Sequence, residues 1–298
     1  MNTKTGLIGL MVAAFLSLTG CGSDDEGNPY SFELELGTVE NGVAEVTVSV
    51  ELTDGTALPN EQIQVSPLMI MTNSVEHGTP FESTTGTLDE NGSYTATAYF
   101  LMPSNMPSGD PMGDWYIDVT YDGQMQTFPI TVEMNSGDVK QLRGGANDQI
   151  MSMNGGTVSR NYYVYNRGRH IHEAMGMNNF EVYVAARESM MDYQAVAEGN
   201  VLNADSMYEL DIASVVVEMC IESCDNETNW KTAMADVENK GVYKGMNLGL
   251  AGDETDIINV RLSVNNDQKD NGDSSNPETT VTFTFDGAVD DSMMHPNH

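Results

Sequence analysis

Methionine and histidine recur in segments of this sequence that could bind a soft metal ion. The first segment runs from Pro67 to Trp115, and its candidate ligands are Met69, Met71, His77, Met102, Met106 and Met112. Thioether sulfur and imidazole nitrogen are the donors that select copper, and Cu(I) in particular. Prolines in the loop that follows Met102 would stiffen it and hold its ligands in place.

A second segment carries the arrangement His-x-His-x-x-Met-x-Met. Its candidate ligands are His170, His172, Met175 and Met177. On a strand, residues two apart lie on the same face, so both imidazoles could reach one ion. The tail Met293 to His298 is a weaker candidate collector of metal ions. The alternative for every methionine is that a flexible apolar side chain only fills gaps in a core.

Short strands would position these donors. Apolar and polar residues alternate over 31–38, 43–52 and 62–71, and turn signals such as Asn91-Gly92 and Asp122-Gly123 separate further short runs. This pattern predicts seven antiparallel strands over residues 29–135, an Ig-like sandwich. If the strands alternate in direction, the loops after the third and fifth strands emerge at the same end. That geometry would bring His77 close to Met102.

The second half of the chain looks like a diverged copy of the first. Residues 136–160 are expected to hold a linker and the first strand of the copy, which then continues over 161–287 with an insertion at 192–240. The predicted fold class is therefore all-β, with two tandem Ig-like antiparallel β-sandwiches. The same argument from strand direction predicts that the His170–Met177 segment faces the first sandwich across the junction.

The start of the chain resembles a bacterial lipoprotein signal. Residues 1–20 contain Lys4, a short apolar run and then Leu18-Thr19-Gly20 before Cys21. An apolar run this short indicates a secretory signal rather than a membrane-spanning helix. The resemblance implies cleavage before Cys21, lipidation of its sulfur and a tether over residues 21–28. The expected location is the bacterial cell envelope, at the outer membrane and facing the periplasm or the surface; the alternative is an unlipidated secreted cysteine.

Cys220 and Cys224 are the remaining cysteines. In an oxidising envelope they are expected to form a disulfide, with a dithiolate metal site as the alternative. Residues 267–278 match part of a calcium-loop pattern, but Lys269 stands at a ligand position, so a hairpin loop is the interpretation.

The charge of the chain limits its partners. Lys and Arg total 12 against 45 Asp and Glu, for a formal net charge of -33. Such a field repels nucleic acid and attracts cations, although solubility in a saline habitat would also explain it. The sequence has no nucleotide-binding glycine loop, nucleophile elbow or zincin helix, so no enzymatic activity is expected.

The first half resembles the YtkA-like and FixH-like envelope domains. The motifs that carry the resemblance are Pro67-x-Met69, His77-Gly78, Gly92-x-Tyr94, Phe100-x-Met102-Pro103 and Gly113-x-Trp115. The resemblance implies small sandwiches that handle metal, chiefly copper. The second half lacks the tryptophan, and its Met–His segment lies in a different loop.

The functional expectation is a lipid-anchored protein that binds copper through Met–His clusters. It would sequester the ion or exchange it with a copper donor or acceptor protein. The alternative is a structural or adhesive surface lipoprotein in which the methionines merely pack, and a third reading is a surface protein stabilised by calcium.

Overall fold

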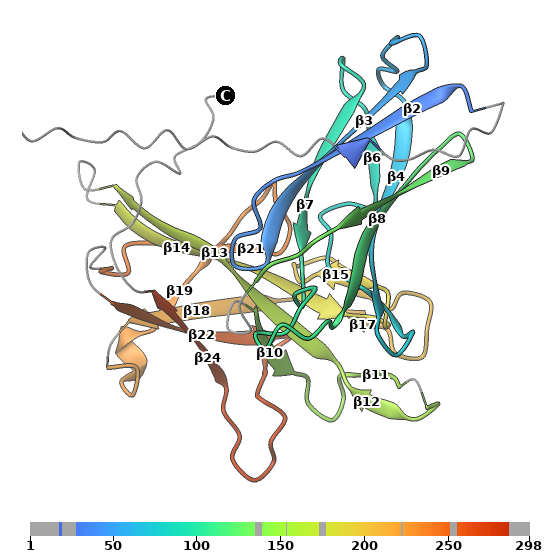
Figure 1. Ribbon diagram of the computed structural model, residues 1–298. Helices are drawn as coiled ribbons and strands as arrows, with labels where there is room; N and C mark the ends of the chain where they lie inside the picture. Colours follow the sequence, from blue (N-terminus) through green and yellow to red (C-terminus); the bar gives the residue numbers. More distant parts are fainter. Residues whose placement is uncertain are drawn as a thin grey trace, which may run out of the picture.

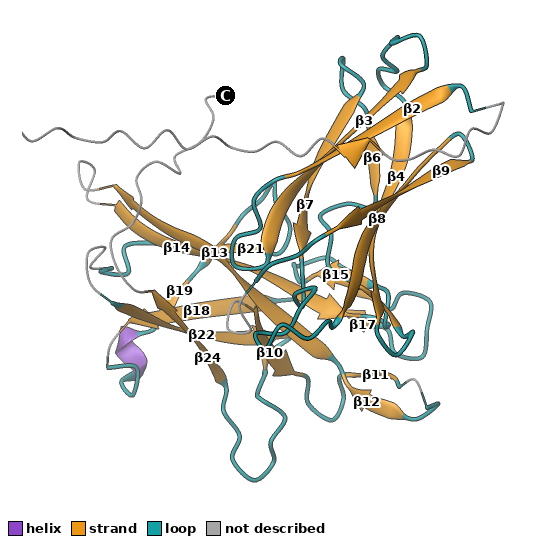
Figure 2. Ribbon diagram, viewed as in Figure 1, coloured by secondary structure: helices purple, strands orange, loops and turns teal. Residues whose placement is uncertain are grey.

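The computed structural model describes residues 18–19, 28–134, 139–152, 154–172, 177–221, 223–250 and 255–285. Nearly all regular structure in this part of the chain is antiparallel β-sheet, as Figures 1 and 2 show. The expectation of an all-β chain built from sandwiches is confirmed. No helix among these residues is long and apolar enough to cross a membrane.

The first sandwich packs two sheets around one apolar core. One sheet has the order β2-β3-β7, with β1 (Leu18–Thr19) beside β2, and the other has the order β5-β4-β8-β9. Its strands are β2 (Tyr30–Leu36), β3 (Val43–Leu52), β4 (Gln62–Met71), β5 (Glu76–Gly78), β6 (Thr85–Thr87), β7 (Ser93–Tyr99), β8 (Gly113–Tyr121) and β9 (Gln124–Ile130). In β3 and β8 every second residue is buried, which is the period-2 pattern that the sequence shows.

The second sandwich has the sheet orders β10-β13-β14-β21-β20 and β19-β18-β22-β24. Its main strands are β10 (Val139–Arg143), β13 (Asn161–His172), β14 (Met177–Arg187), β18 (Val215–Ile221), β21 (Val242–Gly245), β22 (Asp256–Val264) and β24 (Thr280–Phe285). Its short elements are β11 (Gln149–Met151), β12 (Thr157–Ser159), β15 (Tyr193–Ala195), β16 (Val201–Leu202), β17 (Leu210–Asp211), β19 (Lys231–Thr232), β20 (Met234–Ala235), β23 (Asp267–Gln268) and the 3-10 helix η2 (Glu227–Asn229).

The two sandwiches share one strand order. The sheets β2-β3-β7 and β4-β8-β9 of the first correspond to β13-β14-β21 and β18-β22-β24 of the second. A turn glycine supports this match: Gly92 and Gly241 both have positive φ, and their carbonyl oxygens accept from Val50 N in β3 and Val184 N in β14.

This match corrects one expectation about the second half. Residues 192–240 are not an insertion, because they contain β18, the counterpart of β4, which pairs with β22 along its whole length. Residues 136–160 contain a strand of the second sandwich, as expected, because β10 pairs with β13 and adds an edge strand there.

The first sandwich stands with its end on a sheet face of the second (Figure 1). Tyr99, at the end of β7, stacks on Tyr183 of β14 with ring centroids 3.7 Å apart and meets Tyr165 of β13 edge-on. The Tyr99 hydroxyl also accepts a hydrogen bond from Arg167 Nη1 at 2.9 Å. The junction is therefore packed and specific.

A buried ion network fastens the start of the second sandwich. The Asp148 carboxylate accepts from Arg160 Nε and from Lys269 Nζ, each at 2.8 Å, and from the Tyr162 hydroxyl. Arg160 and Lys269 are 0% and 1% exposed, so each charge depends on its partners. Lys269 Nζ also lies 2.8 Å from Asp267 Oδ2. Residues 267–278 lie in the connection between the antiparallel neighbours β22 and β24, as expected of a hairpin loop.

We expect Asp148→Asn to destabilise the protein by about 3–5 kcal/mol, because it leaves two buried cations without their carboxylate. Burial alone would raise the pKa of Asp148, but Lys269, Tyr162 and Arg160 outweigh burial and hold that pKa below its usual 3.8. The carboxylate therefore stabilises the fold fully above the unfolded pKa of about 3.9 and loses this effect as pH falls through the lower folded value.

Urea unfolding at pH values between 7 and 3 measures both the loss of stability in Asp148→Asn and the dependence of wild-type stability on the ionisation of Asp148. Asp114→Asn is the control, since Asp114 is exposed on β8, and a change within about 0.5 kcal/mol is expected there. Equal stability of Asp148→Asn and the wild type at pH 7 would show that the network does not hold the fold.

Candidate metal site in the first sandwich

The loops that follow β4 and β7 meet at one end of the first sandwich. Thr72 N donates to Met112 O at 3.0 Å, and Met71 lies opposite Gly113 in the β4–β8 ladder. Ser104 anchors the longer loop, because its hydroxyl accepts from Val132 N at 3.0 Å. The expectation that strand direction would bring these two loops together is confirmed.

Four of the predicted ligands lie in the segments that meet at this end and belong to or pack against the same core, and we call them the methionine cluster: Met69, Met71, Met102 and Met112. Met69 is 0% exposed in the core, while the other three are half-buried and pack against that core. Trp115 lies opposite Met69 in the β4–β8 ladder, and its indole Nε1 donates to Met102 O at 3.1 Å. A Cβ at Gly113 would lie 2.5 Å from Ile70 O and 2.8 Å from Met71 Cα, so the close approach of β4 and β8 requires glycine there.

The structure leaves Met106 outside this cluster. Met106 is 46% exposed and sits in a turn in which its backbone N–H donates to Asp110 O at 2.8 Å. It is therefore more exposed than the methionine cluster, in which Met69 is buried and the other three are half-buried.

His77 lies at the edge of the methionine cluster. It stands directly across from Met69 in the β4–β5 ladder, so the two side chains project from the same face of the sheet. Burial, and next the positive charge of Arg187, lower the pKa of His77 below its ordinary value of 6.5. The imidazole is thus neutral at pH 7, as a metal ligand must be. The same guanidinium opposes a cation at that ring.

Arg187 belongs to the second sandwich and reaches His77 through the junction. Gly78 N donates to Met190 O at 3.1 Å, which ties β5 to the loop that follows β14. Arg187 itself donates to Ser189 O at 2.8 Å and contacts the Met190 sulfur. The sequence did not predict the positions of Arg187 and Met190 beside His77 and Gly78. No pattern in the chain indicates which loop of one sandwich meets which strand of the other.

The His170–Met177 segment does not face the first sandwich, so that expectation was wrong. The junction is made by Tyr165 and Tyr183, whereas His172 lies seven residues further along β13, which is roughly 23 Å of strand. Figure 1 shows the joined ends of β13 and β14 far from the loops after β4 and β7. The sandwiches meet end to face, whereas the expectation assumed that they stack end to end.

Several predicted sites fall partly or wholly outside the described residues. The backbones of His170, His172 and Met177 are described but their side chains are not, and Met175, Cys21 and the tail from Met293 to His298 are not described at all. Cys220 and Cys224 form a disulfide at the end of β18. Among the described residues, no three His, Cys, Asp or Glu side chains converge where they could hold a metal ion. That statement does not cover methionine thioethers, which are the donors of the methionine cluster.

Comparisons with known proteins do not identify the chain. No protein-family model matches it, and no curated protein matches it. A solved structure of a conserved domain protein from Bacillus anthracis is similar at 12% identity and a TM-score of 0.31, over 97% of this chain and 95% of that chain. The outer membrane decaheme cytochrome OmcA is similar at 8% identity and a TM-score of 0.21, over 88% of this chain and 72% of that chain. Similarity at this level carries no functional argument.

We expect His77 to titrate below pH 6.5, and Arg187→Gln to raise its pKa toward that value. Below pH 6.5 the unfolded chain binds a proton that the folded imidazole resists, so stability falls as pH drops toward the folded pKa. NMR of the imidazole protons against pH measures the shift. Arg261→Gln is the control. It removes a cation from β22, in the sheet of the second sandwich that does not contain Arg187, and should leave the pKa of His77 unchanged. A His77 pKa of 6.5 or higher in the wild type would contradict this placement.

Proposed function

We propose that this protein is a lipid-anchored envelope protein that binds Cu(I) at the methionine cluster of its first sandwich. The observation that supports the proposal is the hydrogen bond from Thr72 N to Met112 O, which joins methionine-bearing segments from distant parts of the chain at one end of the sandwich. The resemblance of the same segment to YtkA-like and FixH-like domains points in the same direction.

The chemistry of the donors suits Cu(I) better than a hard cation. Thioethers are soft and uncharged and need no deprotonation, so they bind Cu(I) and leave Ca²⁺ and Mg²⁺ to carboxylates. Met71, Met102 and Met112 are half-buried, which leaves each of them partly accessible. Met106 in the same loop is exposed and would make the first contact with an ion delivered by a partner protein.

His77 has a smaller part in this proposal than its sequence position indicated. Its neutral ring faces the same side of the sheet as Met69, but Arg187 disfavours a positive ion beside it. We therefore assign the binding chiefly to the four thioethers. The His170–Met177 segment would bind any ion separately, because the sandwiches place it away from this end.

The rival function is structural or adhesive, and one observation favours it. All four methionines of the cluster pack against the apolar core, where methionine commonly serves as a filler. In that case the two joined sandwiches would present a surface, and copper would have no role.

A double substitution, Met71→Leu with Met112→Leu, distinguishes the two functions. Leucine keeps the volume and the apolar character, so the fold should lose less than about 1.5 kcal/mol per site. If thioethers bind the ion, Cu(I) affinity should fall by at least about tenfold, which corresponds to about 1.4 kcal/mol. Anaerobic titration with Cu(I) against a competing chelator measures it.

The matched control for this experiment is Met125→Leu with Met207→Leu. These methionines are 64% and 85% exposed and lie outside the cluster, so copper affinity should not change. Wild-type protein without measurable Cu(I) affinity, or equal affinity in both double variants, would remove the copper proposal and leave the structural one.

The proposed anchor has its own test. Cys21→Ala should move the protein from the membrane fraction to the soluble fraction of a bacterial host, because the acyl chains have no other attachment point. Cell fractionation with detergent partitioning measures this, and Ser23→Ala is the control. Membrane association that persists in Cys21→Ala would exclude lipidation as the anchor.

A further inference from the structure

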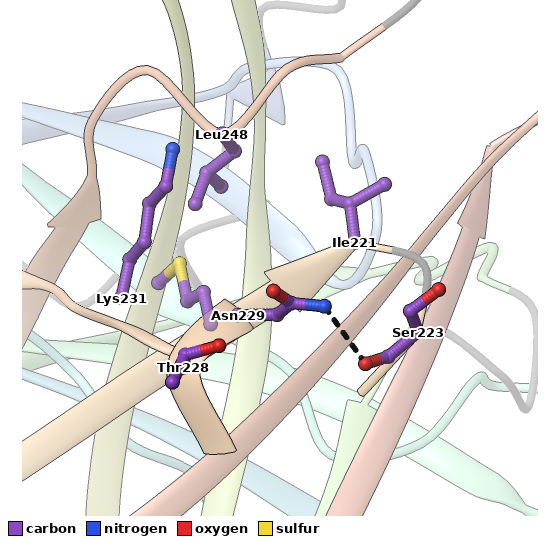
Figure 3. A pocket seen from close by; sticks show the side chains of 7 residues that line it. Ile221, Ser223, Thr228, Asn229, Lys231 and Leu248 are labelled. Carbon is purple, nitrogen blue, oxygen red and sulfur yellow. Dashed lines mark hydrogen bonds between the residues drawn. The ribbon is translucent and has the colours of Figure 1, made fainter. Parts of the chain in front are cut away.

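A pocket of about 330 Å³ opens at the end of the second sandwich that corresponds to the methionine end of the first. Its lining comes from the end of β18, the segment around η2, β19 and the segment after β21: Met219, Ile221, Ser223, Thr228, Asn229, Lys231 and Leu248. Figure 3 shows these side chains around the hollow, with Lys231 and Leu248 on one side and Ile221 and Ser223 on the other.

The rim of the pocket is held by local structure. Ser223 lies inside the loop that the Cys220–Cys224 disulfide closes, and Trp230 Nε1 donates to Cys224 O at 2.9 Å. Asn229 Nδ2 donates to Ser223 O at 3.0 Å, the bond drawn in Figure 3. The polar groups of the rim are therefore positioned before any ligand arrives.

These polar groups are rich in donors. The Lys231 ammonium donates to Asn247 O, which leaves N–H groups of the same ammonium for a ligand. Asn229 has a second amide N–H, and the Ser223 hydroxyl can donate as well. Among the described residues that line the pocket, none is acidic. Glu227, next to Thr228, directs its carboxylate to Arg261, with bonds of 3.2 and 2.7 Å.

Donors on the rim and an apolar floor define the ligand. Among the described lining residues the Lys231 ammonium is the one charged group, which favours an anion over a cation in a chain with 45 acidic and 12 basic residues. Met219, Ile221 and Leu248 supply an apolar floor for a hydrocarbon group. The volume lies at the small end of ligand pockets in proteins. We propose that this pocket binds a small organic carboxylate, with its carboxylate at Lys231, Ser223 and Asn229 and its alkyl part on the floor.

Straight-chain carboxylates from acetate to hexanoate, added to the full oxidised chain, test this proposal. In ¹H–¹⁵N NMR spectra, butanoate should give saturable shifts in the amides of Ser223, Asn229 and Lys231. Affinity should rise with each added methylene, because each buries apolar surface on the floor. Butanamide, which has the same shape without the charge, should bind more weakly.

Lys231→Met tests the charged contact. Lys231 is exposed, so the fold should tolerate the change, and butanoate affinity should fall about tenfold or more. Lys244→Met is the matched control, because Lys244 pairs with Glu181 on the other sheet and lies outside the pocket. The proposal is overturned if butanoate gives no saturable shift at these amides, if butanamide binds equally well, or if Lys231→Met binds butanoate as the wild type does.

Discussion

The architecture depends on one sheet that is buried on both faces. In β13 and β14, Tyr162, Val164, Val182 and Val184 point into the core of the second sandwich. Their neighbours in the alternation, Tyr165, Tyr183 and Ala185, point the other way and form a second apolar cluster with Tyr99 of the first sandwich. Because side chains alternate with period 2, a shift of one residue in this sheet would exchange the two faces. One strand register therefore fixes both the second core and the position of the first sandwich.

This end-to-face junction separates the two candidate sites. The methionine end of the first sandwich lies beside the junction, near the loop that carries Arg187 and Met190. At the corresponding end of the second sandwich, the described residues that line the pocket all come from the second sandwich itself. The two sandwiches share a strand order, yet their matching ends differ: methionines pack against the core at one, and Lys231, Asn229 and Ser223 line a pocket at the other. The two proposed sites therefore rest on different side chains within one strand order.

The sequence allowed the first sandwich to be predicted nearly strand by strand, because alternation over 43–52 and 62–71 coincides with β3 and β4. The meeting of the loops at Thr72 and Met112 also followed from strand direction alone. The junction could not be predicted in this way. Its signal was the nearly unbroken apolar run from Val182 to Ala186, which is typical of a strand covered on both faces.

The place of β18 was missed for a different reason. This strand lies between long irregular segments that have no equivalent length around β4, so the spacing of turns hid the match. The buried ions were equally hidden: Asp148, Arg160 and Lys269 are separated by up to 121 residues, and only the fold brings them together. Local patterns show strands and turns, whereas contacts between distant charged groups follow from the tertiary arrangement.

Electrostatics decides which donors of the first site are available to a cation. The net charge of -33 draws cations toward the whole molecule. At His77, burial and then the positive charge of Arg187 lower the pKa of the imidazole, and the same charge disfavours a cation there. Thioethers carry no charge and gain no proton, so their donor strength does not depend on pH or on the charge of a neighbouring side chain. For the proposed Cu(I) site, this favours the sulfur atoms over the imidazole beside Arg187 as ligands.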